Sequence, residues 1–421
     1  MIRVRIAPSP TGLAHIGTAY TALFNYAFAK KNKGRFVVRI EDTDQKRHIK
    51  EAEKAIFEGL TWLGIDWDES VNTKGEYGPY RQSERLKLYD KKAKELLSRD
   101  LAYKDKGAVR FKNPGIEVVW DDLVKGKISF PGTEITDFVI IKSDGFPTYN
   151  FAVTIDDIEM KITHVIRGEE HVSNTPRQLA LYKAFGVNPP FFAHHPTLRN
   201  KDHKKLSKRR DPVDIGIYKK QGYLPEALIN FLALLGWSHP KGKEIFGLQE
   251  FIDNFSLERV RKSGPFFNIE KLDWLNGQYI KNMSDSELFH QLKIYLGEDY
   301  NLKMVEKTVP LVRDRIKNFS EYISLAGFFF EEPEAVKDLL GENARGHLEA
   351  AYQFLKGVKK WNRETINKGL LEVIATNEFH TGEFFMDLRI AVSGQKVTPP
   401  INESIALLGK DIITDRIKKL I

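Results

Sequence analysis

The chain has 421 residues, of which 42% are hydrophobic, so it is too long for one hydrophobic core and we expect two to four domains. It contains no cysteine, no apolar run of membrane-spanning length and no charged-then-apolar start, which excludes disulfides and thiolate metal sites and predicts a cytoplasmic protein. The net charge of +8 suits a partner with a phosphate backbone, although many basic proteins bind no nucleic acid.

The first elements predicted are a strand, a turn and a helix. The apolar run at residues 4–7 indicates a strand, and a helix is expected from about residue 15 to residue 28. Between them, Pro8 and Pro10 stiffen the loop and Gly12 lets the backbone reverse. The start of the helix therefore faces this loop and offers an anion site made of free backbone N–H groups.

Two residues at the start of this helix suggest a nucleotide. His15 adds a hydrogen-bond donor beside the anion site. Gly17 lies inside the helix, where glycine costs about 1 kcal/mol against alanine. A glycine there indicates that something flat, such as an adenine ring, lies against bare backbone. Taken alone, however, a His–x–Gly is more typical of an ordinary strand–helix turn.

A second strand is predicted at residues 35–40. Strand, helix and strand in this order indicate a right-handed crossover in a parallel sheet. The loops after the carboxyl ends of such strands form the binding crevice, so we expect Arg5, Ser9, His15 and Glu41 to lie there. The alternative for the acidic run after this strand is that Asp42–Asp44 caps the next helix.

The segment from residue 51 to residue 210 alternates helices with short strands. We expect covering helices at 51–63 and 89–97, and a further helix that Ser173 or Asn174 can cap, with Pro176 in its first turn. Short strands are predicted at 108–111, 138–141 and 163–166. His194 and His195 suggest a metal, but no third ligand is near, which favours a structural or substrate-lining role.

The last part of the chain is predicted to be all-helical. Strand signals are sparse after Gly236, and apolar residues recur at helical spacing. The predicted helices are 224–235, 250–255, 269–279, 285–295, 311–326, 348–359, 366–374 and 405–421.

A basic run, KKLSKRR at residues 204–210, surrounds Ser207. Alone it would usually be a solvated stretch. Together with the tetrapeptide HIGT at residues 15–18, it resembles the signature pair of the class I aminoacyl-tRNA synthetases. Six further motifs narrow the resemblance to the bacterial-type glutamyl-tRNA synthetases and cover nearly the whole chain. They are RIAPSPTG at 5–12, RIEDTD at 39–44, GPYRQSER at 78–85, PTYNF at 147–151, IRGEEH at 166–171 and ALLGW at 233–237.

This resemblance implies a fold and a domain order. The expected fold is an α/β Rossmann-type catalytic domain at residues 1–103 and 146–210, with a short α+β insertion at 104–145 that grips the tRNA acceptor end. An all-α C-terminal region follows, in which residues 211–310 contact the tRNA stem and residues 311–421 bind the anticodon. Many relatives bind zinc in a longer insertion through cysteines; this chain has none, so no zinc is expected. A monomer is the family expectation.

The implied activity is that of a glutamate–tRNA ligase acting in protein synthesis. The carboxylate of L-glutamate attacks the α-phosphorus of ATP, and the glutamyl group then passes to the 3′ end of tRNA(Glu). Catalysis of this kind needs positioning and charge stabilisation rather than a protein nucleophile. Mg²⁺ is expected to bridge the phosphates with few protein ligands.

The resemblance also assigns roles to residues. His15, Lys205 and Lys208 are the expected catalytic residues, because the lysines can neutralise departing pyrophosphate and the histidine can donate to the phosphates. Arginine forks suit a carboxylate and Glu41 suits the ammonium group. The expected ATP-binding residues are His15, Gly17, Thr18, Glu170, Leu198, Lys205, Ser207, Lys208 and Arg209. The expected glutamate-binding residues are Arg5, Ala7, Ser9, Glu41, Tyr149 and Arg167.

Several alternatives remain open at this point. Arg5 and Arg167 could form plain ion pairs with acidic neighbours, and Tyr149 could be a core ring. The protein could resemble the tRNA-modifying enzyme that places glutamate on queuosine, but such proteins lack the helical C-terminal region. It could be a catalytically inactive tRNA-binding relative, which should have lost His15, Lys208 or Glu41. It could also be a non-discriminating form that charges tRNA(Gln) as well.

Overall fold

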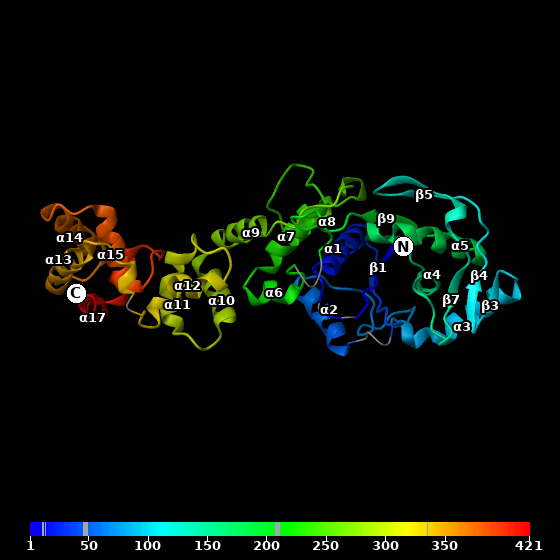
Figure 1. Cartoon of the computed structure of the whole chain (residues 1–421), viewed down its shortest axis with the longest axis horizontal. Helices are drawn as coiled ribbons and strands as arrows, with labels where there is room; N and C mark the ends of the chain where they lie inside the picture. The colour runs from blue at the N-terminus through cyan, green and yellow to red at the C-terminus, as the bar shows by residue number, and fades with distance from the viewer. Residues whose placement is uncertain (11, 13, 45–48, 207–210, 335) are drawn as a thin grey trace. The chain divides into compact units, whose positions relative to one another are not determined.

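The computed structural model describes the chain apart from residues 11, 13, 45–48, 207–210 and 335. The described residues form two compact units. Unit 1 comprises Met1–Lys219 and Pro225–Leu272, and unit 2 comprises Lys220–Leu224 and Asp273–Ile421. All strands of the described residues belong to unit 1, and unit 2 is helical (Figure 1). The helices of the described residues are all too short or too polar to cross a membrane.

The predicted strand–helix–strand crossover is present at the start of unit 1. β1 (Arg3–Ile6) and β2 (Arg35–Val38) pair in parallel, and α1 (Ile16–Lys31) connects them. All four residues of β1 are buried, as expected for a parallel strand covered on both faces. The sequence pattern therefore predicted this strand–helix–strand crossover correctly, with the ends of each element within about three residues of the observed ones.

Next to this pair lies a second group of strands. β8 (His164–Gly168) and β9 (Phe191–His195) pair in parallel across η4 (Glu169–Asn174) and α5 (Thr175–Phe185). The N–H of Thr163 donates to the carbonyl of Arg3 at 2.9 Å, so β1 and β8 are adjacent. The carboxyl ends of β1, β2, β8 and β9 therefore meet at one edge.

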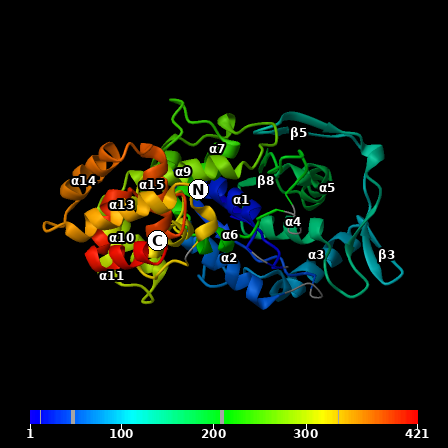
Figure 2. The same ribbon diagram turned by 60° about the vertical axis from the view of Figure 1, so that its left-hand side comes forward.

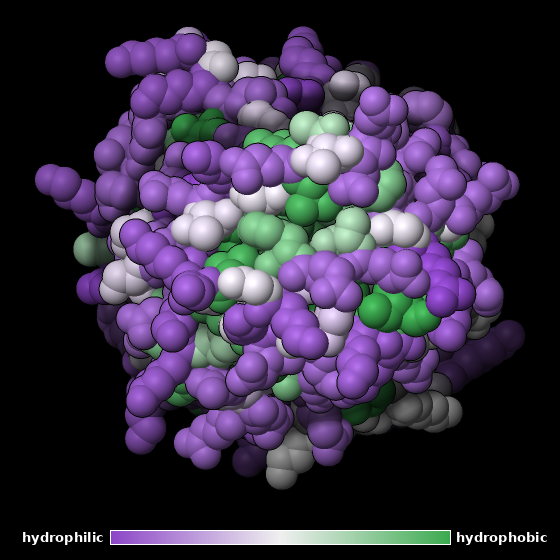
Figure 3. Space-filling model, turned by 90° about the vertical axis from the view of Figure 1, so that its left-hand side faces the viewer, coloured by the Kyte–Doolittle hydropathy of each residue, from purple (hydrophilic) through white to green (hydrophobic). Residues whose placement is uncertain are grey.

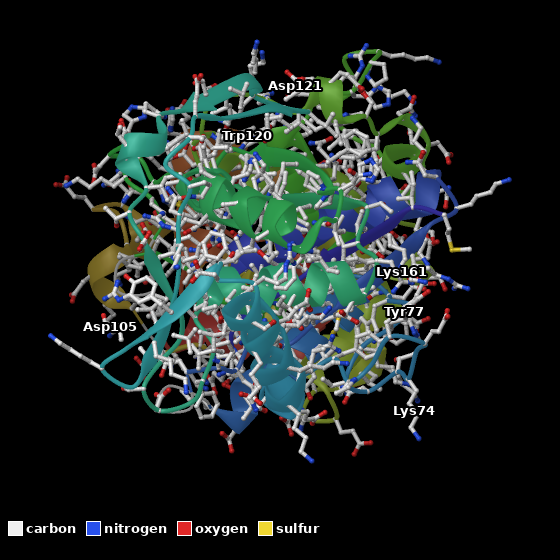
Figure 4. All side chains as sticks on the ribbon, turned by 90° about the vertical axis from the view of Figure 1, so that its right-hand side faces the viewer. Lys74, Tyr77, Asp105, Trp120, Asp121 and Lys161 are labelled. Atoms are coloured by element: carbon white, nitrogen blue, oxygen red, sulfur yellow. The ribbon has the colours of Figure 1, made fainter. Side chains whose placement is uncertain are left out.

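A hairpin completes this sheet and was not predicted. β5 (Val118–Asp122) and β6 (Gly126–Phe130) are antiparallel, and β5 joins β9 in parallel at Asp122 and Phe192. The resulting strand order is β6-β5-β9-β8. Figure 4 shows Trp120 and Asp121 on β5; Trp120 is buried in the core, whereas Asp121 is exposed. The region predicted as one insertion, residues 104–145, is thus divided between two sheets.

The other sheet contains the strands that the sequence did predict in this region. β3 (Ala102–Asp105), β4 (Ala108–Phe111) and β7 (Phe138–Ile141) form an antiparallel sheet, and the bounds of β4 and β7 match the predicted ones. Its apolar face packs on α3, α4 and α5. The remaining elements of unit 1 are α2 (Lys50–Trp62), η2 (Gln82–Arg85), α3 (Leu86–Ser98), η3 (Gly132–Glu134), α4 (Tyr149–Glu159), α6 (Ile215–Lys220), α7 (Pro225–Gly236), α8 (Leu248–Asn254) and η5 (Leu257–Arg259).

Two local predictions in unit 1 are corrected. The expected cap of α2 at Asp42–Asp44 is wrong, because the residue before α2 is Ile49 and Asp42 instead accepts hydrogen bonds from Ser83. Asn174 does precede α5, but its side chain makes no capping bond. The Asp42 carboxylate and the Asn174 side-chain amide instead make tertiary contacts, which the spacing of residues in the sequence does not reveal.

The all-helical prediction for the last part of the chain is confirmed. Its elements are α9 (Ile269–Lys281), α10 (Asp285–Leu296), α11 (Leu302–Val312), α12 (Ser320–Ala326), η6 (Gly327–Phe329), η7 (Lys337–Leu339), α13 (Ala344–Gly357), α14 (Arg363–Thr376), α15 (Thr381–Ser393), α16 (Ile401–Leu408) and α17 (Lys410–Lys418). α13 packs against α14, α15 and α17 (Figure 2). The face over these helices is mostly hydrophilic around a smaller group of hydrophobic side chains (Figure 3).

Two predicted helices of unit 2 differ from the observed ones, and one observed helix was not predicted. The predicted helix 311–326 is wrong: α11 ends at Val312, and α12 begins at Ser320 after Phe319 has donated its N–H to Gly222. The predicted helix 405–421 is broken at Gly409, whose φ of 93° is incompatible with a helix. α15 was not predicted at all.

Candidate active site

A cavity of about 550 Å³ opens at the carboxyl ends of β1, β2, β8 and β9. Every predicted site residue that the structure describes lines it. These residues are Arg5, Ala7, Ser9, His15, Gly17, Thr18, Glu41, Tyr149, Arg167, Glu170, Leu198 and Lys205. The predicted site residues Ser207, Lys208 and Arg209 lie outside the described residues. Residues up to 200 positions apart in the sequence therefore meet in one place.

The first turn of α1 forms one wall of the cavity. His15 precedes the helix in an extended conformation, and its Nδ1 accepts the N–H of Gly17 at 2.9 Å. An accepting Nδ1 carries no hydrogen, so the hydrogen of the neutral ring is on Nε2. One of the backbone donors that were expected to meet an anion is thus used by His15.

Gly17 has a structural role in addition to the one predicted. A Cβ at this position would lie 3.0 Å from Nδ1 of His15, tighter than ordinary contacts allow. Gly17 therefore makes room for the capping ring, and that ring is the described neighbour of its bare backbone. Gly17 is also in the first turn of α1 rather than one turn inside it.

Arg5 and Glu41 belong to a buried ion network that the sequence did not reveal. Nε and one terminal nitrogen of Arg5 each lie 3.1 Å from a carboxylate oxygen of Asp157. Arg39, which is fully buried, contacts Asp157 at 2.7 Å and Glu41 at 3.2 Å. Two of the five Arg5 donors are therefore engaged by a protein carboxylate, and Arg5 still lines the cavity.

The two carboxylates of this network differ in their protonation. Burial opposes ionisation of Asp157, but Arg5 and Arg39 outweigh it and hold the pKa of Asp157 below its usual value. Burial also acts on Glu41, and there it raises the pKa to about 7 despite the attraction of Arg39. Glu41 therefore lines the cavity as a carboxyl group that is only partly ionised at neutral pH.

Arg167 is buried, with 4% of its surface exposed, yet no carboxylate of the described residues forms an ion pair with it. Its Nε donates to Nε2 of His194 at 3.0 Å, and Nη2 donates to Oγ1 of Thr175 at 2.9 Å. Nη1 has no hydrogen-bond partner among the described residues. Burial and the like charge of Arg5 lower the pKa of Arg167. A buried cation with a spare donor is suited to binding an anion.

Tyr149 lies beside a histidine that was quoted in a motif but given no role. Its hydroxyl is 3.3 Å from Nδ1 of His171, and Nδ2 of Asn174 is also 3.3 Å from that nitrogen. Burial lowers the pKa of His171 to about 4, so the ring is neutral at pH 7. Burial raises the pKa of Tyr149, so its hydroxyl keeps its proton. This corner of the cavity offers uncharged hydrogen-bonding groups.

Two predicted ATP-binding residues contact each other. Nζ of Lys205 lies 2.8 Å from Oε1 of Glu170, and both side chains are partly exposed. The Glu170 carboxylate folds over Gly168, where a Cβ would collide with it. Glu170, one of the expected ATP-binding residues, therefore has a protein partner, although an exposed pair of this kind contributes only about 0–1 kcal/mol.

The paired histidines have distinct surroundings. His194 lies between Asp122 and Arg167, whereas His195 lines the cavity next to Tyr20 and Thr21. Among the residues that the structure describes, no group of three or more His, Cys, Asp or Glu side chains could hold a metal ion.

Sequence reasoning missed several residues of this site. Thr21, His171, Asn174 and Thr197 also line the cavity, and Asp157 anchors Arg5. A signal for Asp157 was available: the apolar stretch at 151–158 contains two adjacent aspartates, and a charged pair inside a buried helix needs charged partners. The strand that carries its partner Arg5, β1, could not be identified from the sequence spacing alone.

Comparison with known proteins adds two family models that match the chain. The model described as the catalytic domain of the class I tRNA synthetases (E and Q) matches residues 1–108 and 105–274. The model described as an anticodon binding domain matches residues 286–421.

Individual relatives are similar over almost their whole length. The chain is 42% identical to a glutamate–tRNA ligase of Carboxydothermus hydrogenoformans, with all of both chains covered, and 39% identical to glutamate–tRNA ligase 1 of Fervidobacterium nodosum, covering 99% and 98% of the two chains. Among solved structures, a glutamate tRNA ligase from Elizabethkingia meningosepticum in complex with its amino acid matches with a TM-score of 0.87 and 32% identity, covering 100% and 99%.

Proposed function

Because the chain belongs to the class I tRNA synthetases of the glutamate and glutamine group, we propose that it is a glutamate–tRNA ligase. Full-length similarity to proteins of that name supports the reaction: ATP-dependent activation of L-glutamate and its transfer to the 3′ end of tRNA(Glu). The observation that carries the proposal for the site is Arg167, a buried guanidinium with an unpartnered nitrogen among the described residues, in a cavity that also contains Glu41.

The amino acid is held by complementary charge. Glutamate has one ammonium and two carboxylates; Glu41 binds the ammonium, with Ser9 and the backbone of Ala7 beside it. Arg167 binds a carboxylate with its guanidinium group, and Tyr149 adds a hydroxyl. Arg5 contributes mainly through its positive charge, because two of its donors are on Asp157.

ATP lies against the start of α1, with adenine toward Leu198 and Gly17. His15 donates its Nε2–H to the phosphates as negative charge develops on them, and Thr18 lies in the same turn. Lys205, released from Glu170, neutralises the departing pyrophosphate together with Lys208, and Glu170 then meets the ribose. Ser207 and Arg209 complete the ATP site in this proposal.

Magnesium is the expected companion of ATP in such a reaction, and when bound it neutralises phosphate charge. The described residues contain no group of three or more metal-binding side chains, so these side chains do not form a cage for it. The steps assigned here to His15 and Lys205 do not depend on such a cage.

The transfer step needs tRNA. The match of residues 286–421 to an anticodon binding domain supports a role for unit 2 in holding the anticodon, while the 3′ end reaches the cavity in unit 1. We also infer that the enzyme works as a monomer in the cytoplasm, where its product is used. Residues 211–310 are assigned to the tRNA stem in this proposal.

Two measurements test the function. The purified chain should catalyse glutamate-dependent exchange of pyrophosphate into ATP, and it should attach radiolabelled glutamate to a tRNA(Glu) transcript. A tRNA(Gln) transcript in the same assay tests for the non-discriminating form. Absence of both exchange and charging, with ATP bound normally, would instead indicate an inactive tRNA-binding relative.

A further inference from the structure

Asp122, at the end of β5, is a buried carboxylate that has no role in the proposed reaction. Only 3% of its surface is exposed. Oδ1 accepts the backbone N–H groups of Val124, Lys125 and His194 at 3.0, 2.9 and 3.1 Å, which fixes the hairpin turn against β9. Oδ2 has a different partner: it lies 2.5 Å from Nδ1 of His194. The turn accounts for Oδ1 but leaves the Oδ2 contact without a structural reason.

The two neighbours of His194 leave its ring only one neutral form. The Asp122 carboxylate can only accept, so Nδ1 must carry a hydrogen. Nε of Arg167 can only donate, so Nε2 must present a lone pair at 3.0 Å. In the opposite tautomer, two N–H groups would face each other at one end and a lone pair would face the carboxylate at the other. The hydrogen bonds in the series Asp122–His194–Arg167 therefore all run in one direction: Arg167 donates to His194, and His194 donates to Asp122.

This chain determines where the Arg167 guanidinium lies. Nε is held by His194 and Nη2 by Thr175, so two bonds set the plane of the group. Phe192 lies against one face of that plane, with 5.4 Å between its ring centre and the guanidinium carbon. The third nitrogen, Nη1, is the one without a partner among the described residues, and Arg167 lines the cavity.

From this geometry we propose that Asp122 is a positioning residue for amino-acid recognition, acting through His194 to aim Arg167 at a carboxylate of the substrate. The inference rests on the proposed function, because it assumes that Arg167 binds the amino acid. The hairpin β5–β6 thus serves the amino-acid site.

The test is Asp122→Asn, which preserves shape and can keep an oxygen for the backbone N–H groups. Its amide nitrogen would face Nδ1 of His194 and force the hydrogen onto Nε2, against Arg167. By analogy with the loss of a hydrogen-bond partner behind a metal ligand, we expect KM for glutamate in pyrophosphate exchange to rise about 10- to 100-fold, while KM for ATP changes less than about twofold. The matched control is Asp121→Asn, because Asp121 is adjacent on β5 but exposed, and both KM values should remain unchanged (Figure 4).

A double-mutant cycle separates positioning from general damage. In the Arg167→Gln background, Asp122→Asn should have no further effect on KM for glutamate, because its target is gone. An equal loss in both backgrounds, or equal losses for glutamate and ATP, would overturn the proposal. At His194, glutamine can still accept from Nε of Arg167 and donate to Asp122, whereas leucine cannot. His194→Gln should therefore remain much closer to the wild type than His194→Leu; equal losses would also contradict the proposal.

The tautomer of His194 can also be determined by a measurement that does not depend on enzyme activity. In the unsubstituted protein labelled with ¹⁵N-histidine, the His194 signal, assigned by its loss in His194→Gln, should show hydrogen on Nδ1. Hydrogen on Nε2 would overturn the inference even if Asp122→Asn failed to fold. The two failures are distinguishable: a wild-type protein without glutamate-dependent exchange refutes the proposed function, whereas normal exchange with the wrong tautomer refutes only the role of Asp122.

Discussion

Arg5 and Asp157 face each other in the interior of unit 1, with two guanidinium nitrogens each 3.1 Å from a carboxylate oxygen. Arg167, on the adjacent strand β8 and lining the same cavity, has no such partner among the described residues. The two arginines were expected to act alike on the substrate. From their different surroundings we expect Arg5 to contribute more to stability and Arg167 more to amino-acid binding, and both effects can be measured.

Replacing Arg5 with glutamine should chiefly reduce stability. The change leaves Asp157 buried with Arg39 as its remaining cation, so we expect a loss of about 3 kcal/mol in the free energy of unfolding, at the lower end of the range for a broken buried pair. Urea denaturation measures this loss. A variant as stable as the wild type, with a strongly raised KM for glutamate, would show instead that Arg5 is primarily a substrate ligand.

Replacing Arg167 with glutamine should chiefly affect the choice of amino acid. No carboxylate of the described residues is left unpaired, so stability should fall less than for Arg5→Gln. A glutamine substrate would place its amide N–H₂ against the donor Nη1, and sites of this kind can reject an analogue by about 10⁴–10⁵. We expect the ratio of kcat/KM for glutamate over glutamine to narrow sharply. Lysine should rescue only in part, because a point charge does not reproduce the fork.

The activity should depend on pH through Glu41. Its pKa of about 7 lies above that of an ordinary carboxyl group, because burial disfavours the charged form. Binding the ammonium requires the ionised form, so kcat/KM for glutamate should rise as the pH increases through about 7. The stability contribution has the opposite sign: it is largest at acidic pH and is lost as the pH rises through the same range. In Glu41→Gln the remaining activity should lack this acid limb, and an unchanged limb would assign it to another group.

Lys205 should act on the rate rather than on ATP affinity. Its bond to Glu170 is partly exposed and costs little to break, so it can move to the pyrophosphate. We expect Lys205→Ala to lower kcat for pyrophosphate exchange about 10²-fold, as for the loss of one well-placed transition-state donor. Lys204→Ala, at an exposed neighbour, is the control. A rise in KM for ATP without a loss of kcat would indicate a ground-state role.

Zinc should be dispensable. The chain has no cysteine, and the residues described by the structure include no group of three possible ligands. Activity should therefore survive a zinc-specific chelator that leaves magnesium free. Stoichiometric zinc in the purified protein, lost together with activity, would contradict this prediction.

The parts of the fold that were predicted depend on local signals. β1, α1 and β2 follow from an apolar run, a loop with prolines and glycine, and a helical repeat, all within about 35 residues. β5 and β6 were missed because β5 alternates buried and exposed side chains over only five residues. The break between α11 and α12 depends on a bond from Phe319 to Gly222, almost 100 residues away, which no local window contains.

The candidate site also has a part that local motifs predicted and a part that they did not. The motifs predicted that His15, Glu41 and Arg167 lie together, and they line one cavity, because each follows or precedes a predictable strand or helix. The partners that set their chemistry, Asp157 and Asp122, lie 152 positions from Arg5 and 72 positions from His194. Tertiary pairing over such distances decides which donors remain available to a substrate.

The place of β6 at the end of the order β6-β5-β9-β8 has a consequence for solubility. Without the hairpin, β9 would become an edge strand, and its sequence FFAHH would offer unpaired backbone groups to other molecules. β6 is a safer edge, because it is short and has Lys127 within it. Shortening this region in an engineered variant should therefore spare residues 118–130. Variants that lack them should form strand-to-strand aggregates even where the rest of the chain folds.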